Sequence, residues 1–218
     1  MRDTAPVGSQ QVRHPVFARM YARLSAHDEE QGQAEHRREL LAGAAGRVIE
    51  VGAGHGLNFE HYPDTVAEVV AVEPEAYLRE LAGRVAAEAP VPVRVVDGLA
   101  DRLPADDGEF DAAVASLVLC SVPDQATALA EVHRVLRPGG ELRFYEHVVG
   151  NTSGLARLQR LIRPGWKLVA GGCNPDRDTA AGIEAAGFTI ERIRRFDFAP
   201  SPVEYPVKPR ILGIARRA

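Results

Sequence analysis

The chain has 218 residues, 45% of them hydrophobic, which is enough to bury one sizeable core, so we expect a single domain over residues 1–218. A formal net charge of −4 argues against a general nucleic-acid binder, and no apolar stretch approaches the roughly 18 residues that span a bilayer. Its two cysteines, Cys120 and Cys173, lack the spacing of a metal site or a disulfide framework, so we expect a cytoplasmic protein without a bound metal or an integral membrane segment.

The N-terminal part of the chain, residues 1–43, is expected to form a loose tail followed by helices. Residues 1–13 are polar, and apolar side chains then recur at helical spacing from Val16 to Leu24. This amphipathic helix either packs on the body of the domain or closes over an active site as a lid, because periodicity alone does not separate the two. The charged segment from Asp28 to Glu39 is expected to continue as helix until Gly43.

A glycine-rich turn follows the first predicted strand. Val48 to Val51 is a β-branched run typical of a strand that is buried on both faces. Gly52, Gly54 and Gly56 then allow a tight turn in which a ligand can approach the backbone, and Glu50 favours a partner with hydrogen-donating groups. The pattern indicates a nucleotide-like cofactor, or a glycine turn that serves close packing alone.

The second predicted strand, Val69 to Val72, ends at Glu73 and Pro74. A nucleoside-binding α/β fold places a carboxylate at this point against the ribose hydroxyls. Glu73 is therefore a candidate ribose ligand, or else a favourable negative charge near the N-terminus of the helix that we expect to begin at Pro74.

Three more strands are predicted, at residues 91–96, 110–115 and 141–145, with a helix from Asp124 to Arg137 before the last of them. Strand and helix thus alternate, which predicts a doubly wound parallel sheet. Ligands of such sheets bind beyond the carboxyl ends of the strands. The residues expected there to contact the cofactor, besides Glu73 and Pro74, are Asp97, Gly98, Leu99, Ser116 and Leu117.

The order of these motifs resembles that of the class I S-adenosylmethionine-dependent methyltransferases. The resemblance rests on five motifs in chain order: Glu50 to Gly56, Glu73, Asp97-Gly98, Phe110-Asp111 and Leu136 to Gly140. A dinucleotide dehydrogenase would need G-x-G-x-x-G, whereas here the third glycine comes one residue too early. The resemblance implies a Rossmann-like, doubly wound α/β sheet of seven strands, with two further strands near 188–193 and 210–215 and the last one antiparallel.

The same resemblance implies S-adenosyl-L-methionine as cofactor and S-adenosyl-L-homocysteine as its product. Residues 44–150 would form the cofactor-binding core and residues 181–218 the C-terminal strands. Asn58 and Tyr62 are placed on the helix after the turn. The residues of the turn expected to bind the cofactor are Glu50, Gly52, Ala53, Gly54, His55, Gly56 and Asn58.

Shorter motifs are similar to those of the alkyl-thiol methyltransferases and their small bacterial relatives. These motifs are Leu117 to Val122, Glu146 to Val148, Pro164 to Trp166 and Gly172 to Asn174. They extend the match to nearly the whole chain and imply a small thiol as methyl acceptor. Eukaryotic members of that group carry an apolar N-terminal membrane anchor that is not found in this sequence, so we do not transfer membrane association or lipophilic substrates from them.

Methyl transfer requires the protein mainly to align a nucleophile and exclude water, because the sulfonium methyl of the cofactor is already a strong electrophile. A thiol with its ordinary pKa of about 8.5 attacks as the thiolate, and a nearby base would help to form it. His147 follows the fifth strand at the edge of the expected pocket and is the candidate base, with Glu146 to orient it. The alternative for His147 is a structural histidine.

Residues 151–180 interrupt the alternation of strands and helices and are expected to choose the substrate. Arg157, Arg160 and Arg163 fall three apart, which on a helix makes a basic stripe: a solvated face, or a site for an acidic substrate. Cys120 lies on an apolar run and is interpreted as a small buried residue rather than a nucleophile. The residues expected to form the substrate wall are Cys120, Trp166, Cys173, Asn174, Arg177 and Tyr205.

The sequence thus favours a methyltransferase for a small molecule, with a thiol as the leading acceptor. An O- or N-methyltransferase of secondary metabolism would use the same cofactor half. A catalytically silent, cofactor-binding regulatory protein is the alternative from another class. An RNA methyltransferase would show a clustered basic surface or an appended RNA module, and the sequence has neither.

Overall fold

The computed structural model describes residues 15–218. The predicted tail at residues 1–13 lies outside this part of the chain, as do the side chains of Val16, Phe17 and Leu24 from the predicted amphipathic helix. A helix, α1, does run over Pro15–Asp28. The predicted helix is therefore confirmed in its backbone.

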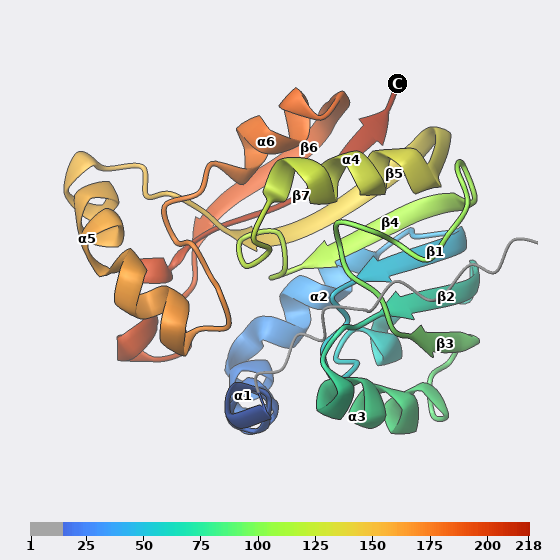
Figure 1. Ribbon diagram of the computed structural model, residues 1–218, viewed down its shortest axis with the longest axis horizontal. Coiled ribbons are helices and arrows are strands. Elements are labelled where there is room, and N and C mark those ends of the chain that lie inside the picture. Colours follow the sequence, from blue (N-terminus) through green and yellow to red (C-terminus); the bar gives the residue numbers. More distant parts are fainter. Residues whose placement is uncertain (1–14) are drawn as a thin grey trace, which may run out of the picture.

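One sheet contains all seven strands of the described chain, in the order β3-β2-β1-β4-β5-β7-β6 (Figure 1). The first five strands pair in parallel, whereas β7 runs antiparallel between β5 and β6. The strands are β1 Gly46–Val51, β2 Val66–Val72, β3 Val93–Val96, β4 Phe110–Ser116, β5 Leu136–His147, β6 Phe188–Asp197 and β7 Pro209–Arg217. This confirms the predicted seven-stranded Rossmann-like sheet with an antiparallel last strand.

Helices cover both faces of the sheet, with α4 and α6 above it and α2 and α3 below it in Figure 1. Ile49 and Val51 of β1 belong to a core shared with α4 and α6, whereas Val48 belongs to a core shared with α2 and α3. Successive strand residues face opposite sides, which is why this β-branched run is buried on both. The helical elements after α1 are η1 Glu29–Gln33, α2 Ala34–Leu41, η2 Phe59–His61, α3 Ala76–Ala86, α4 Gln125–Val135, α5 Ser153–Val169, α6 Thr179–Ala185 and η3 Pro202–Val207.

The N-terminal helices bend at a glycine. Gly32 has a φ of 110° inside η1, a conformation outside the helical region that glycine adopts readily. The prediction of an uninterrupted helix from Asp28 to Glu39 is therefore wrong at this residue. The end of the helical segment is predicted well, because α2 ends at Leu41 and Gly43 follows with a φ of 78°.

Side-chain caps set the beginnings of α3 and α4. The helix predicted from Pro74 begins two residues later, because Glu75 caps it by accepting from the backbone N–H of Leu78 at 3.0 Å. In the same way, Asp124 caps α4, which begins at Gln125. This helix ends before its predicted limit, because the chain already pairs with β4 as strand β5 from Leu136 onward.

The helix predicted after the glycine turn is only the short 3-10 turn η2, Phe59–His61. Asn58 and Tyr62 flank this turn instead of lying on a helix. The residue before a proline disfavours the helical conformation, and Pro63 follows Tyr62, so the chain leaves the helical region there. The prediction of a full helix at this position is thus wrong.

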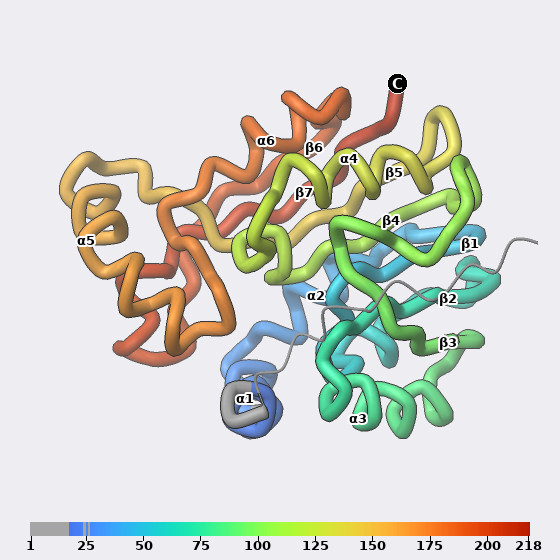
Figure 2. Tube along the Cα trace, in the orientation of Figure 1, coloured from blue at the N-terminus to red at the C-terminus, as the bar shows by residue number. Residues whose placement is uncertain are grey.

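The inserted segment forms α5, which lies beside η3 although residues 170–201 separate them in sequence (Figure 2). The Gln159 side chain is buried and donates to the carbonyl of Pro206 at 3.0 Å, which ties the two together. Arg157, Arg160 and Arg163 are exposed, as the interpretation of the basic stripe as a solvated face requires. Within residues 15–218, no helix combines the length and the apolar character needed to cross a bilayer.

Candidate functional site

The carboxyl ends of the parallel strands meet at one edge of the sheet, to which the arrowheads of β1, β2 and β4 point in Figure 1. Polar or glycine-rich segments follow each of these ends. Parallel α/β sheets bind their ligands beyond such ends. The segments concerned are 52–56 after β1, 73–75 after β2, 97–99 after β3, 116–121 after β4 and 146–150 at and after the end of β5.

The three glycines of the turn have different tasks. All three have a positive φ, of 66° at Gly52, 60° at Gly54 and 91° at Gly56. A Cβ at Gly52 would collide with Val118, and a Cβ at Gly56 would lie 2.7 Å from the ring of Phe59, so these two glycines permit close packing. A Cβ at Gly54 would meet only the Tyr21 ring, at 3.5 Å. Gly54 is therefore the position where a missing side chain leaves the backbone open to a ligand.

Glu50 is buried beneath the turn. Its carboxylate accepts from the Asn58 side-chain amide at 2.8 Å and from the Tyr62 hydroxyl at 2.7 Å. Burial raises the pKa of Glu50 from 4.5 to about 7, against the opposing effect of these two hydrogen bonds. Glu50, Asn58 and Tyr62 thus form one hydrogen-bonded group that holds the turn in place, and Tyr62 takes part in it as a donor.

The raised pKa of Glu50 predicts a pH-dependent stability. The unfolded chain ionises this carboxyl near pH 4.5 and the folded chain near pH 7, so stability falls as the pH rises between these values. Glu50→Gln stays uncharged, so its free energy of unfolding should not fall in this way. We expect it to rise relative to that of the wild type by up to about 3 kcal/mol between these two pH values. Urea unfolding of both proteins at pH 5, 6, 7 and 8 measures the gap, and a gap that is independent of pH would contradict the burial effect.

Glu73 reaches back from β2 to the glycine turn. Its two carboxylate oxygens accept from the backbone N–H groups of Gly54, at 2.8 Å, and Glu75, at 2.9 Å, and the residue is 5% exposed. Burial raises the pKa of Glu73 to about 7, while these hydrogen bonds act to lower it. The contact with Gly54 joins the two motifs that were singled out in the sequence.

An arginine missed by sequence reasoning connects the ends of β2 and β3. The Arg79 guanidinium donates to the carbonyls of Glu73 and Pro74 and pairs with Asp97 at 3.2 Å. Gly98 is a packing glycine, because a Cβ there would lie 2.8 Å from a methyl of Val72. Arg79 therefore links Asp97, on the predicted adenine side, to the backbone of the predicted ribose ligand Glu73.

The N-terminal helices lie over the glycine turn. The Tyr21 ring meets the His55 imidazole edge-on at a centroid distance of 5.7 Å, and the Ser25 hydroxyl lies 3.3 Å from Nε2 of His55. His55 Nδ1 is buried and has no hydrogen-bond partner within residues 15–218. The first helix thus packs against His55 of the glycine turn, a contact that both alternatives for this helix allow.

Arg37 on α2 is a second residue that sequence reasoning missed. It is 3% exposed, and its guanidinium donates to Glu29 at 2.8 Å and to the side chains of Asn58 and Ser116 at 3.0 Å each. Arg37 thus places a buried positive charge between the glycine turn and the end of β4. The sequence shows one arginine among several on a charged helix, and only the bend at Gly32 and the packing of α2 distinguish it.

Glu146 holds the loop after β4. Its buried carboxylate accepts from the backbone N–H groups of Val118, Leu119 and Cys120 at 2.8 to 3.0 Å. Burial raises the pKa of this carboxyl well above its ordinary value. Because both oxygens serve the loop, Glu146 positions the backbone around Cys120. The predicted role of orienting the His147 imidazole is not the one that the structure shows.

His147 lies between the two cysteines. Its Nδ1 is 3.8 Å from Sγ of Cys120 and 3.9 Å from Sγ of Cys173, and both cysteines are buried. The hydrogen bond with Cys173, together with burial, raises the pKa of the Cys120 thiol, so by itself Cys120 is no ready nucleophile, in agreement with the interpretation from sequence. Cys120 and Cys173 lie on two loops and His147 is the last residue of β5, which is why the spacing of the cysteines gave no sign of the cluster.

Other predicted substrate residues hold these loops together. The backbone N–H of Asn174 donates to the carbonyl of Cys120 at 2.8 Å, and its side-chain amide donates to Cys120 and Gly172. The Arg177 guanidinium donates to the carbonyls of Leu119 and Val122. Asn174 and Arg177 therefore act through the loop backbone in this structure.

The contact between the 120 and 172 loops needs a glycine. Gly172 has a φ of 91°, and a Cβ there would lie 2.8 Å from the carbonyl oxygen of Ser121. We expect Gly172→Ala to lower the free energy of unfolding by about 2 kcal/mol. Gly154→Ala is the matched control, because Gly154 has no heavy atom within 4 Å of its missing Cβ and no positive φ. Urea denaturation compares the two, and equal stabilities would contradict the close approach.

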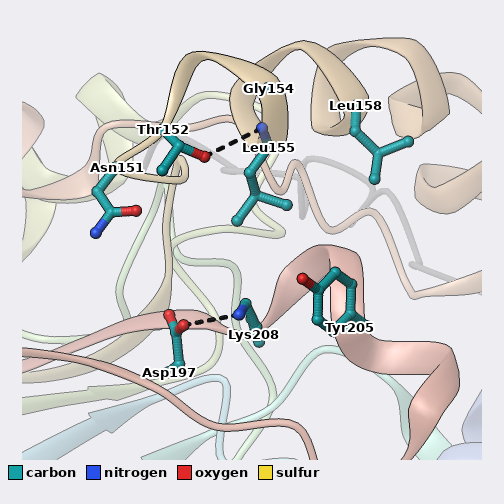
Figure 3. A pocket seen from close by; sticks show the side chains of 8 residues that line it. All are labelled: Asn151, Thr152, Gly154, Leu155, Leu158, Asp197, Tyr205 and Lys208. Carbon is teal, nitrogen blue, oxygen red and sulfur yellow. Dashed lines mark hydrogen bonds and ion pairs between the residues drawn. The ribbon is translucent and has the colours of Figure 1, made fainter.

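Two further predicted substrate residues are Trp166, on α5, and Tyr205, on η3. Trp166 is on α5, and its indole Nε1 is buried without a hydrogen-bond partner in the described chain. Tyr205 lines a surface hollow opposite Leu155 and Leu158 of α5 (Figure 3). Its ring is 57% exposed and packs against Lys208, which pairs with Asp197 at 2.9 Å. The lining of this hollow contains no residue of the cysteine and histidine cluster.

Comparison with known proteins assigns the family. Residues 49–144 match the sequence model of a protein family described as a methyltransferase domain. The chain is 36% identical to human thiol S-methyltransferase TMT1B over 182 residues, which cover 80% of this chain and 73% of the relative. It is 33% identical to the Rattus norvegicus TMT1B over 212 residues, covering 91% and 85% of the two chains.

The fold agrees with this assignment. The structure of a geranyl diphosphate methyltransferase in complex with GPP and sinefungin superposes with a TM-score of 0.66 at 17% identity, covering 85% of this chain and 78% of that chain. The domain match, the similarity to curated methyltransferases and the order of the strands agree with one another. The chain therefore belongs to the S-adenosylmethionine-dependent methyltransferase family that includes the thiol S-methyltransferase TMT1B.

Proposed function

We propose that the protein methylates the sulfur of a small thiol. The observation that carries this proposal is the extent of the match to TMT1B. The match to the rat protein covers 91% of the present chain and leaves only about 20 of its residues unmatched. The inserted segment 151–180 is longer than that, so the match must reach into it. Since methyltransferases share the cofactor half and differ at the acceptor side, similarity in this segment supports the same acceptor chemistry.

The edge of the sheet fits an adenosyl cofactor. Gly54 leaves the turn open, the Glu73 carboxylate lies behind it, and His55 Nδ1 is a buried polar atom without a partner in the described chain. A cofactor with ribose hydroxyls and a charged amino-acid end offers hydrogen bonds to such groups. When bound, S-adenosylmethionine supplies an electrophilic methyl group on a sulfonium sulfur.

We assign the parts of the cofactor to this edge as follows. Glu73 takes the ribose hydroxyls, and Asp97 to Leu99 adjoin the adenine. The buried Arg37 guanidinium suits the carboxylate of the methionine part, because it already lies against Asn58 and Ser116. The remaining residues proposed to contact the cofactor are Glu50, Gly52, Ala53, Gly54, His55, Gly56, Pro74 and Leu117.

The chain's own residues then position the acceptor and exclude water. Helix α1 covers the glycine turn, and Glu146, Asn174 and Arg177 fix the loops that carry Cys120 and Cys173. The acceptor is proposed to approach at these loops, beside His147. Holding two reactants in line in a water-poor site supplies much of the acceleration that such a transfer needs.

A matched set of acceptors tests the proposal. Benzyl mercaptan, benzyl alcohol and benzylamine share one carbon skeleton and differ in the attacking atom. We expect the full chain, supplied with S-adenosylmethionine, to form benzyl methyl sulfide and to leave the alcohol and the amine unmethylated, as measured by mass spectrometry. Methylation of the alcohol or amine but not of the thiol would overturn the choice of acceptor. No turnover on any thiol of an alkyl and aryl panel would favour the regulatory alternative.

A further inference from the structure

We propose that Cys120, His147 and Cys173 form a site for a soft divalent metal ion of the zinc class, whose open fourth position takes the sulfur of the methyl acceptor. The three potential ligand atoms all lie within 4.8 Å of one another. They lie at the carboxyl edge of β4 and β5, on the acceptor side of the proposed cofactor site. The metal site stands on this geometry alone, whereas its use by an acceptor thiol rests on the proposed function.

The separations are close to those of a tetrahedral site. Zinc bonds of about 2.3 Å to sulfur and about 2.0 Å to nitrogen place neighbouring sulfur and nitrogen ligands of a tetrahedral site about 3.5 Å apart. The observed distances from Nδ1 of His147 are 3.8 Å to Cys120 and 3.9 Å to Cys173. Two sulfur ligands of one zinc ion lie about 3.8 Å apart, and all three potential ligand atoms here lie within 4.8 Å of one another. A shift of at most about 1 Å between the two sulfurs therefore closes the three ligands on an ion.

The donor set is that of a reactive site. Two thiolates and one imidazole are ligands that zinc prefers, and together they neutralise its charge. Structural zinc sites are closed by four protein ligands, whereas sites with three protein ligands leave a position for water or a substrate. Cys120, His147 and Cys173 are the whole cluster of potential ligands at this place in the described residues, so the fourth position is open.

The surrounding hydrogen bonds fix these ligands in advance. Glu146 accepts from the backbone N–H of Cys120, and Asn174 donates to the carbonyl of the same residue. Gly172 permits the loop that carries Cys173 to approach Ser121. Metal sites depend on such outer contacts to orient their ligands, and here the contacts draw together two loops and the end of β5, which are far apart in sequence.

The site gives the acceptor its reactive form. An acceptor thiol that binds the ion releases its proton to solvent and stays bound as the thiolate. A lone pair of that sulfur forms the new bond to the methyl carbon, and the carbon–sulfonium bond breaks with its electron pair remaining on the sulfur of S-adenosylhomocysteine. The product thioether is neutral and a weaker ligand, so it leaves. His147 then acts as a ligand, and no separate base is needed.

Cobalt tests the site directly, because tetrahedral Co²⁺ with thiolate ligands has charge-transfer and d–d bands that zinc lacks. We expect the reduced full chain to bind one Co²⁺ per molecule with these bands, and Zn²⁺ to displace it. Cys173→Ser and His147→Gln should weaken binding at least tenfold. His133→Gln is the matched control, because His133 lies on α4 against Phe188, away from the cluster.

Adding benzyl mercaptan to the Co²⁺ protein should change the charge-transfer band, and S-adenosylmethionine should then reverse the change as the thioether forms. Absence of the bands, or bands that persist unchanged in Cys173→Ser, would overturn the metal site. Thiol methylation by a chain that binds no metal would overturn this inference and leave the proposed function intact. If the Co²⁺ protein shows these bands but methylates no thiol, the metal site stands and the proposed function is overturned.

Discussion

Glu73→Gln is expected to raise the Kd for S-adenosylhomocysteine about 10- to 100-fold. The ionised carboxylate can accept from both ribose hydroxyls while it keeps its bonds to Gly54 and Glu75, and such charge-assisted hydrogen bonds contribute about 1.5–3 kcal/mol. Isothermal titration calorimetry measures the loss. Glu68→Gln is the control, because Glu68 lies on the same strand but pairs with Arg47 at the surface.

The same carboxylate predicts a pH dependence of cofactor binding. The pKa of Glu73 is raised to about 7, and ribose hydroxyls donate to the ionised form. Affinity for S-adenosylhomocysteine should therefore rise by up to about tenfold between pH 6 and pH 8 in the wild type. Glu73→Gln should lose this dependence. An equal Kd for wild type and variant at pH 8 would remove Glu73 from the cofactor site.

Arg37→Ala is expected to lower the free energy of unfolding by about 3 kcal/mol, because it removes a buried cation from its partner Glu29 and from two hydrogen-bond acceptors. It should also weaken S-adenosylhomocysteine binding at least tenfold, since the proposed partner of the methionine carboxylate is lost. Urea unfolding and calorimetry separate the two effects.

The neighbouring arginine provides the comparison for this variant. Arg38 is exposed on the same helix, so Arg38→Ala should change stability by less than about 0.5 kcal/mol and leave binding unchanged. If Arg37→Ala and Arg38→Ala lower the free energy of unfolding equally, the buried hydrogen bonds and ion pair of Arg37 do not stabilise the fold. If Arg37→Ala is destabilised but binds the cofactor as before, Arg37 serves the fold alone.

The sheet could be predicted from the sequence because its strands are local signals. Val48, Ile49 and Val51 form a β-branched run typical of a strand that is buried on both faces, and Gly52, Glu73 and Asp97 follow directly after β1, β2 and β3. The errors fall where the chain departs from periodicity. Gly32 bends an otherwise continuous charged helix, and Pro63 prevents a full helix after the turn.

Candidate site residues could be predicted where they directly follow the end of a strand in the sequence. Glu73 and the glycine turn are examples, and the structure brings them into contact. Long-range contacts leave no such local trace. Arg37 reaches Ser116 across 79 positions in sequence, and Cys120 and Cys173 meet His147, at the end of β5, from two separate loops. Their roles follow from packing, which neither spacing nor composition encodes.

The crystal structure of the full chain with S-adenosylhomocysteine tests the central claim most directly. We predict that the ribose hydroxyls lie within hydrogen-bond distance of the Glu73 carboxylate, with the adenine near Asp97. The homocysteine sulfur should face the loops that carry Cys120 and His147. A product molecule bound elsewhere, or one whose sulfur points away from these loops, would contradict the assignment of this edge as the site of methyl transfer.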